Sequence, residues 1–346
     1  MKSFFIDSLS KKIRQIENTM RIIYHYALDG AQSAQQRQIL KTALIGLETD
    51  VRNEEFIPFL EVPLSIYSGI HGDEKPAYPL AAMTSLLFLG IDILDDLQDG
   101  DTPPHWKASE PSQRNLAAFT LLCALPQKMI SEFEIPNSDK ILLQKTLSEG
   151  FMKMGAGQLS DLGMTHHHTL NSEAVLNSVI QKSGFELGVF THLACQFSGV
   201  QADAAEPFIQ LGCHMGTAAQ LSSDCYDLFE AEISRDLQHG TRTLPLVLHL
   251  EKLSAHDKEK FYHLLDQAQT DAGLRKTIQK ELYQSGSVRH TAIIVELYCQ
   301  KAHRALKDCN LSNLETNHLQ KIIDHISFFK NRRQEHGHAR SWKTHR

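Results

Sequence analysis

The spacing of apolar residues constrains the fold of this chain more than any other feature of the sequence. Apolar side chains recur at i, i+3, i+4 and i+7 along nearly all 346 residues, which places them on one face of a helix. The strict alternation that is typical of a strand is almost absent. We therefore predict an all-α protein, with helices over about residues 8–29, 34–49, 77–98, 112–132, 138–162, 171–199, 203–231, 242–252, 256–268, 271–283, 287–308 and 312–331.

No internal repeat and no long linker divide these helices. The sequence therefore predicts a single all-helical domain over residues 1–331. Residues 332–346 are rich in basic side chains and have no helical periodicity, so we expect them to form a basic, flexible tail.

Four aspartates lie on one face of the predicted helix at 77–98 and its continuation. Asp92, Asp95, Asp96 and Asp99 are spaced i, i+3, i+4 and i+7, and they directly follow the apolar run 85–91. Carboxylates this close repel one another and are costly to bury. A solvated acidic helix end would explain an isolated pair, but it rarely follows an apolar face so abruptly.

Binding of a hard divalent cation would explain why four carboxylates lie so close together. Mg²⁺ prefers oxygen ligands, keeps part of its hydration shell and typically binds a substrate phosphate as well. The alternating aspartates, central glycine and closing glutamate of an EF-hand calcium loop are not met. The sequence therefore predicts a site where Mg²⁺ holds a phosphorylated substrate whose remaining part is apolar.

A second polar cluster lies farther along the chain. Gln220, Ser223, Asp224 and Asp227 again share one helical face. Small residues upstream of this cluster, at 212, 216 and 219, allow another helix or a ligand to approach the backbone closely.

Charge and composition exclude several other classes of protein. The net charge of −6 is mild and mixed, so neither nucleic acid nor an anionic membrane is expected as a partner. No uninterrupted apolar stretch has the length of a membrane span, and the first residues turn polar too soon for a signal peptide. The six cysteines lack metal-type pairing, which is typical of reduced thiols. We therefore expect a cytoplasmic protein.

The order of these motifs resembles that of the polyprenyl synthetase family over about residues 75–250. The segments that carry the resemblance are Asp95-Asp96-Leu-Gln-Asp99, Gly157-Gln158-x-x-Asp161, Lys182-Ser-Gly184, Gly212-x-x-x-Gly216-x-Ala218-x-Gln220-x-x-Ser223-Asp224-x-x-Asp227 and Arg235-Asp236-Leu-x-x-Gly240. The resemblance implies a single-domain isoprenoid synthase bundle of helices around a deep central cavity, and a homodimer. It also implies about three Mg²⁺ ions on the diphosphate of an allylic prenyl substrate.

The resemblance assigns a role to individual residues. The implied catalytic residues are Asp95, Asp96, Asp99 and Lys182. The implied metal ligands are Asp95, Asp96, Asp99, Ser223, Asp224 and Asp227. Diphosphate-binding roles fall to Lys182, Arg235, Gln158 and Gln220. An apolar wall is needed to keep water from a carbocation, and its candidates are Phe88, Phe151, Phe185, Phe190 and Phe229, with Ile91 at the floor.

The chain departs from the family pattern where the second substrate, isopentenyl diphosphate, would bind. The paired arginine that usually follows the first acidic cluster is missing, and the basic motif expected upstream is poorly matched at 71–79. Ser223 replaces an aspartate, and Thr241 stands where a lysine is usual. These losses favour a terpene-synthase-like enzyme that ionises one allylic diphosphate, with a C15 chain as the favoured substrate, and releases pyrophosphate.

Two alternatives remain open from the sequence. One is a prenyltransferase that uses isopentenyl diphosphate, a peptide or a small molecule as acceptor. The segment 92–101 also resembles that of bacterial prenyltransferases that modify a pheromone peptide. The other alternative is a non-catalytic subunit that regulates a prenyl synthase, although five of the six expected metal carboxylates are present.

Overall fold

The computed structural model describes residues 2–164, 171–231 and 233–330, and within them it confirms the all-α prediction, with helices and no strand. The predicted tail at 332–346 lies outside the described residues. The α-helices are α1 (Lys2–Tyr24), α2 (Ala34–Asn53), α3 (Pro58–His71), α4 (Tyr78–Asp99), α5 (Pro111–Phe119), α6 (Leu125–Glu132), α7 (Asn137–Met164), α8 (Ser172–Val179), α9 (Phe185–Phe197), α10 (Glu206–Phe229), α11 (Arg235–His239), α12 (Leu244–Leu250), α13 (Ala255–Ala268), α14 (Arg275–Gln284), α15 (Ser287–Asp308) and α16 (Asn313–Ile326).

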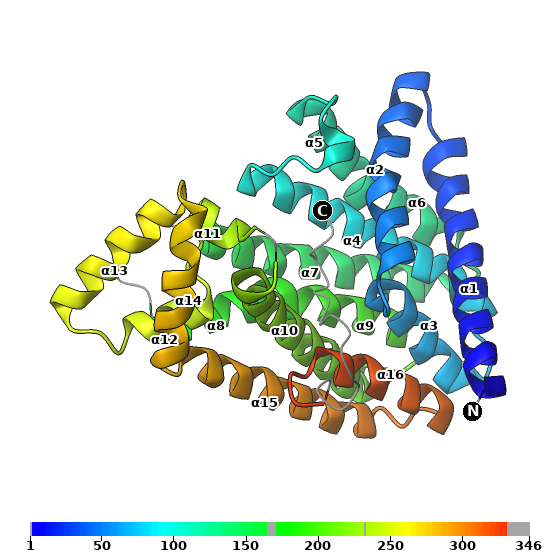
Figure 1. The fold of residues 1–346 in the computed structure, drawn as a ribbon. Coiled ribbons are helices and arrows are strands. Elements are labelled where there is room, and N and C mark those ends of the chain that lie inside the picture. Colours follow the sequence, from blue (N-terminus) through cyan, green and yellow to red (C-terminus); the bar gives the residue numbers. More distant parts are fainter. Residues whose placement is uncertain (1, 165–170, 232, 331–346) are drawn as a thin grey trace.

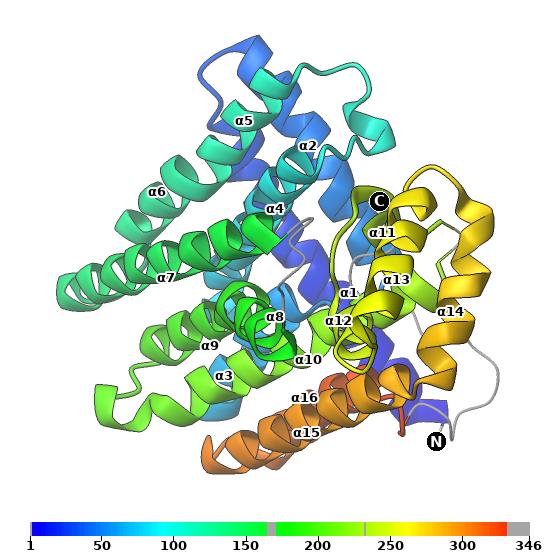
Figure 2. The same cartoon turned by 90° about the vertical axis from the view of Figure 1, so that its left-hand side faces the viewer.

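Helix α10 lies at the centre of the bundle. It packs against α9 on one side and α15 on the other, and α7 packs against α9, so that these four helices run side by side (Figure 2). At one end of the molecule α11 to α14 form a lobe of shorter helices (Figure 1). A separate apolar cluster fills this lobe, including Leu228, Leu246, Phe261 and Ile278. All six cysteines are free, and five of them are buried.

Helix α4, which carries the first acidic cluster, is largely buried. Residues Lys75–Asp99 have the length and composition of a membrane-spanning helix, with a mean hydropathy of 1.7 in their most apolar window. However, 72% of that window is buried inside the protein. The apolar residues of α4 therefore serve the core of the bundle.

The sequence did not predict α3. Pro58 is at a favourable position at the start of this helix, but Pro63 lies inside it and cannot donate a hydrogen bond to the carbonyl of residue 59. The hydroxyl of Thr84 on α4 donates a hydrogen bond to that carbonyl at 2.6 Å. A neighbouring helix thus satisfies the acceptor that the proline leaves open, and this contact fixes α3 against α4.

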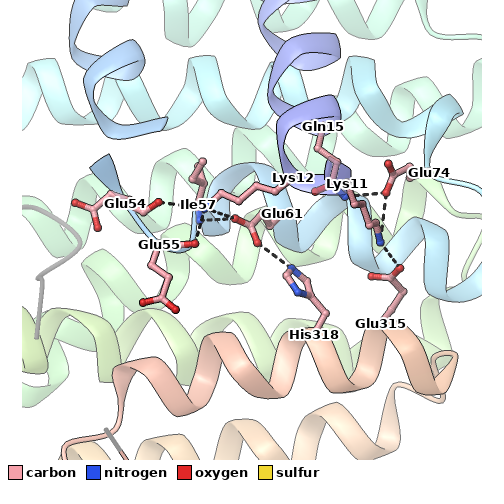
Figure 3. A network of polar contacts seen from close by, with 10 residues as sticks. All are labelled: Lys11, Lys12, Gln15, Glu54, Glu55, Ile57, Glu61, Glu74, Glu315 and His318. Carbon is pink, nitrogen blue, oxygen red and sulfur yellow. Dashed lines mark hydrogen bonds and ion pairs between the residues drawn. The ribbon is translucent and has the colours of Figure 1, made fainter. Parts of the chain in front are cut away.

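A buried carboxylate joins three helices that are far apart in the sequence (Figure 3). Glu61 of α3 is 1% exposed, and it accepts hydrogen bonds from the Ile57 backbone N–H at 2.9 Å and from His318 Nε2 of α16 at 2.8 Å. Lys12 of α1 lies 3.5 Å away. Burial alone would raise the pKa of Glu61, but His318 and Lys12 outweigh it and hold this pKa below its usual value. Glu61 therefore folds as a charged group with matched partners.

Replacing Glu61 with alanine should lower the free energy of unfolding by about 3 kcal/mol at neutral pH, because it removes a buried carboxylate and leaves its partly buried partners, Lys12 and His318, without a counter-charge. The pKa of Glu61 is lower in the folded than in the unfolded chain, so its contribution is present above about pH 4.5 and is lost as the pH falls below that value. Urea unfolding at pH 7 and pH 4 measures both effects. The exposed Glu134→Ala variant is the control and should change stability by no more than about 0.5 kcal/mol. A similar loss in both variants would contradict this account.

Candidate active site

The two predicted polar clusters face one cavity. The cavity is lined from α4, the end of α7, α10, the segment 175–183 and the residues around α11. Nine aspartates line it: Asp92, Asp95, Asp96, Asp99, Asp101, Asp161, Asp224, Asp227 and Asp236. Lys182, Ser223, Gln220 and Arg235 line it as well. Gln158 does not line it, but its side-chain amide donates to Asp95 at 3.1 Å. The structure thus brings together all the polar residues that the sequence singled out.

Lys182 neutralises part of this charge. Its ammonium group lies 2.7 Å from Asp95 Oδ1 and 3.1 Å from Asp161 Oδ2. Lys182 belongs to a single π-helical turn, Ile180–Gly184, between α8 and α9. Such turns often occur at functional sites. Burial alone would lower the pKa of Lys182, but the charges of Asp95 and Asp161 outweigh it and raise this pKa above its usual range. The group is therefore a permanent cation in the cavity.

The side chains of the second cluster are held by hydrogen bonds. The Ser183 hydroxyl donates to Gln220 Oε1 at 2.9 Å, and Gln220 Nε2 donates to Asp224 Oδ1 at 2.8 Å. Asp227 accepts hydrogen bonds from the backbone N–H groups of Arg235 and Asp236 at 3.0 and 3.2 Å. These contacts fix the orientation of the carboxylates before any ligand binds.

The negative charge that Lys182 does not neutralise is unfavourable, and burial together with this charge raises the pKa of two aspartates. Burial, followed by the charge of Asp95, raises the pKa of Asp99 to about 6. Burial and the charges of Asp227 and Asp224 raise the pKa of Asp236 well above its usual value. Arg235 offsets part of this charge through Asp101, whose carboxylate lies 3.2 Å from its guanidinium group. Additional cations would relieve the repulsion that is left.

The donor set fits a hard divalent cation by its chemistry. Carboxylate oxygens from α4 and α10 and the hydroxyl of Ser223 are the ligands that Mg²⁺ accepts. Within the ranges that the structure describes, no group of three or more His, Cys, Asp or Glu side chains could hold an ion by itself. Mg²⁺ commonly uses only one or two carboxylates and completes its shell with water and substrate phosphates. The assignment of metal ligands from the sequence therefore stays a prediction.

An apolar cavity adjoins the acidic one, since Ser183, Gln220 and Ser223 line both. The apolar part is lined further by Pro58, Phe59, Phe88, Glu186, Leu187, Phe190, Gly216 and Ala219. The rings of Phe59 and Phe88 are stacked, with centroids 4.2 Å apart and an interplanar angle of 16°. Together the two cavities thus have a charged end and an aromatic end.

Four predicted wall residues do not line this apolar cavity. Ile91 and Phe151 pack against the main hydrophobic core, and Phe229 packs against the apolar cluster of the α11–α14 lobe. The ring of Phe185 faces the ammonium of Lys153 at 5.6 Å. Phe185 follows Ser183 by two residues, which places it on the opposite side of the helix from the cavity. Phe88 and Phe190 do line the cavity, and the sequence analysis had named both as candidates.

The sequence analysis missed Phe59 and Glu186. Phe59 lies on α3, the helix that was not predicted, so no signal placed it near the site. Glu186 could have been found, because it follows Ser183 by three residues and therefore lies on the same helical face.

The wall formed by α10 rests on direct backbone contact, as the small residues in its sequence predicted. A Cβ atom added to Gly216 would lie 2.1 Å from the carbonyl oxygen of Ser183, and one added to Gly212 would lie 2.4 Å from that of Leu187. Both distances are too short for any side chain. These glycines therefore allow α10 to lie directly against the segment that carries Lys182.

Comparisons with known proteins agree with this architecture. The structure resembles that of geranylgeranyl pyrophosphate synthetase from Pyrococcus horikoshii, with a TM-score of 0.80 and 19% identity over 94% of this chain and 99% of that one. It also resembles polyprenyl synthase from Caulobacter crescentus, with a TM-score of 0.77 and 16% identity over 92% and 95% of the two chains. These similarities define the all-α isoprenoid synthase fold, as the sequence predicted.

The sequence comparison is more specific. Residues 64–282 match the polyprenyl synthetase family model, so the chain belongs to this family of enzymes. It is 23% identical over 280 residues to the nonaprenyl diphosphate synthase of Mycobacterium tuberculosis, which covers 78% of this chain and 81% of that protein. The family resemblance seen in the motifs is thereby confirmed. These relatives favour prenyl transfer, the alternative interpretation of the sequence, over the single-substrate interpretation that was placed first.

The raised pKa of Asp99 has a consequence for stability. Because this pKa is about 6 in the folded protein and lower in the unfolded chain, the metal-free protein should lose stability as the pH rises through about 6. Asp99→Asn should remove this loss and raise the free energy of unfolding at pH 7.5 by about 0.5 kcal/mol, a small value because the side chain is exposed to solvent screening.

Urea unfolding in EDTA at pH 5 and pH 7.5 measures this effect. The exposed Asp203→Asn variant is the matched control and should behave as the wild type at both values. A gain for Asp99→Asn that is larger at pH 5 than at pH 7.5 would show that the charge of Asp99 is not the cause.

Proposed function

We propose that this protein is a Mg²⁺-dependent prenyltransferase that ionises an allylic prenyl diphosphate and transfers the prenyl group to an acceptor. The observation that carries the proposal is the pair of adjoining cavities, one lined by nine aspartates and Lys182 and the other by stacked aromatic rings. A diphosphate with bound cations fits the first end, and a hydrocarbon chain fits the second.

Each part of the site has a separate task in this proposal. Asp95, Asp96 and Asp99 on α4 and Ser223, Asp224 and Asp227 on α10 would hold Mg²⁺. When bound, Mg²⁺ supplies positive charge where negative charge develops on the departing pyrophosphate.

The basic and aromatic side chains complete the site. Lys182 and Arg235 bind diphosphate oxygens directly, and Gln158 and Gln220 orient the carboxylates that they contact. Phe59, Phe88 and Phe190 exclude water from the allylic cation.

Two observations bear on the acceptor. The relatives named above are diphosphate synthases, and the Caulobacter protein was crystallised with calcium and isoprenyl diphosphate, which supports prenyl transfer. Among the residues lining the acidic cavity, however, only three are lysine or arginine, and Lys182, Arg235 and Arg242 each have a carboxylate within 3.5 Å. A second diphosphate would find little further positive charge there. Conversion of one allylic diphosphate alone is therefore the second candidate function.

Incubation with prenyl diphosphates distinguishes these functions. Purified protein with Mg²⁺ is given geranyl, farnesyl or geranylgeranyl diphosphate, each with and without isopentenyl diphosphate, and pyrophosphate and extracted products are measured. We propose farnesyl diphosphate, with its C15 chain, as the preferred substrate. A longer diphosphate that appears only with isopentenyl diphosphate identifies chain elongation. A hydrocarbon or alcohol from one substrate identifies the single-substrate function, whereas no pyrophosphate in any mixture supports the non-catalytic subunit.

The carboxylates of α4 should be essential for turnover but not for folding. Asp95→Asn or Asp96→Asn should lower the rate of pyrophosphate release by about 10²-fold or more, because a cation ligand is lost. The melting temperature of Asp96→Asn should change little, since repulsion between like charges is relieved, whereas Asp95→Asn also removes the carboxylate that pairs with Lys182. Asp203→Asn is again the control and should retain the full rate. Full activity of both α4 variants would rule out the proposed metal site.

A further inference from the structure

The end of helix α10, which carries Asp227, is held by a side chain from outside the cavity. The last carbonyls of a helix have no hydrogen-bond partner within it. Arg275, the first residue of α14, supplies partners for this helix end. Its Nη2 donates to the Asp227 carbonyl at 3.0 Å, and its Nε donates to the Leu228 carbonyl at 2.9 Å. Its Nη1 donates to the Ala231 carbonyl at 2.5 Å, so one guanidinium group caps the end of α10.

The charge of Arg275 offsets an unfavourable placement of carboxylates. The C-terminal end of a helix carries partial negative charge, which destabilises an aspartate there. Asp224 and Asp227 lie in the last two turns of α10, and no residue of its last turn, all of which the structure describes, is basic. Arg275 thus brings a positive charge from α14 to the helix end at which two carboxylates of the cavity lie.

Asp227 is held through its side chain as well as through its backbone. The Ser234 hydroxyl donates a hydrogen bond to its carboxylate, as do the N–H groups of Arg235 and Asp236 described above. Arg275 holds the carbonyl of the same residue. Asp227 lines the acidic cavity, whereas Arg275 is not among the residues that line it. Arg275 therefore acts on the site through the backbone of Asp227 and not by contact with a ligand.

A second side chain of α14 holds the same helix end without touching Asp227. Gln279 follows Arg275 by four residues, so the two lie on one face of α14. The Gln279 Nε2 donates to the Leu228 carbonyl at 2.7 Å. This contact brings no charge, and it ends on a residue whose side chain belongs to the apolar cluster of the α11–α14 lobe. Gln279 therefore shares the structural role of Arg275 but not its link to the cavity.

We infer that Arg275 is a positioning residue for cation binding at Asp227, an inference that rests on the function proposed above. By bonding the Asp227 carbonyl and offsetting the charge at the end of α10, Arg275 keeps the Asp227 carboxylate at one place in the cavity. Groups that orient a ligand of a metal ion raise the affinity for that ion, although they do not touch it. Helix α14 thus contributes to the site although none of its residues lines the acidic cavity.

Arg275→Ala tests this inference, because it removes the positive charge and the donors to α10. Calorimetric titration with Mg²⁺ in the presence of inorganic pyrophosphate gives a dissociation constant without turnover, and this constant should rise about tenfold or more. The Mg²⁺ concentration that gives half-maximal release of pyrophosphate from the prenyl diphosphates should rise as well. The matched control Gln279→Ala removes a donor to the same helix end and should leave both values unchanged.

The possible outcomes separate the two proposals. If the wild type is active and the dissociation constant rises equally in both variants, or in neither, the inference about Arg275 is wrong and the proposed function stands. If the wild type releases no pyrophosphate from any mixture, the proposed function fails and the inference fails with it. Thermal unfolding shows whether the variants fold. If Arg275→Ala does not fold, Arg275→Lys, which keeps the charge but not the planar set of donors, should raise the constant by a smaller factor, and an unchanged constant overturns the inference.

Discussion

Repulsion between carboxylates on two facing helices is the constraint around which this structure is arranged. Asp95 and Asp99 on α4 share one cavity with Asp224 and Asp227 on α10, and burial together with the charge of Asp95 raises the pKa of Asp99 to about 6. The protein offsets this repulsion with Lys182 and with backbone N–H groups at the start of α11. The helices themselves are held by apolar packing, since α10 is buried between α9 and α15. The free energy of apolar packing in the core thus holds α4 and α10 in place against the repulsion between their carboxylates.

The residues at the junction of the two cavities contact both the charged and the apolar environment. Ser183, Gln220 and Ser223 face both environments, and a hydrogen-bond chain runs from Ser183 through Gln220 to Asp224. A substrate with a charged head and a hydrocarbon tail has one orientation in such a space. Lys182 and Glu186 lie on one segment beside this junction, Lys182 in the acidic cavity and Glu186 in the apolar one.

Periodicity predicted most of the helices and both acidic clusters, because these features depend on spacing within one helix. It failed where a helix depends on a contact with a residue that is distant in the sequence. Pro63 argues against a helix at α3, and only the Thr84 hydroxyl on another helix satisfies the carbonyl that this proline leaves open. Phe185 was chosen for its residue type, although its helical phase relative to Ser183 directs it away from the cavity. The same phase would have identified Glu186. The metal ligands and the bound substrate depend on groups that the sequence does not contain.

The contact between Gly216 and the Ser183 carbonyl sets a limit on how this enzyme can diversify. With 2.1 Å between that oxygen and a Cβ at residue 216, the two helical segments can neither approach further nor accept a bulkier residue. The width of the cavity at this point is therefore a fixed dimension of the scaffold. A different substrate range would then arise through side chains that line the cavity, such as the stacked Phe59 and Phe88, which can change in volume while the backbone stays where it is. Related enzymes would then differ in the side chains that shape the cavity, while the spacing of the two helical segments at Gly216 stays the same.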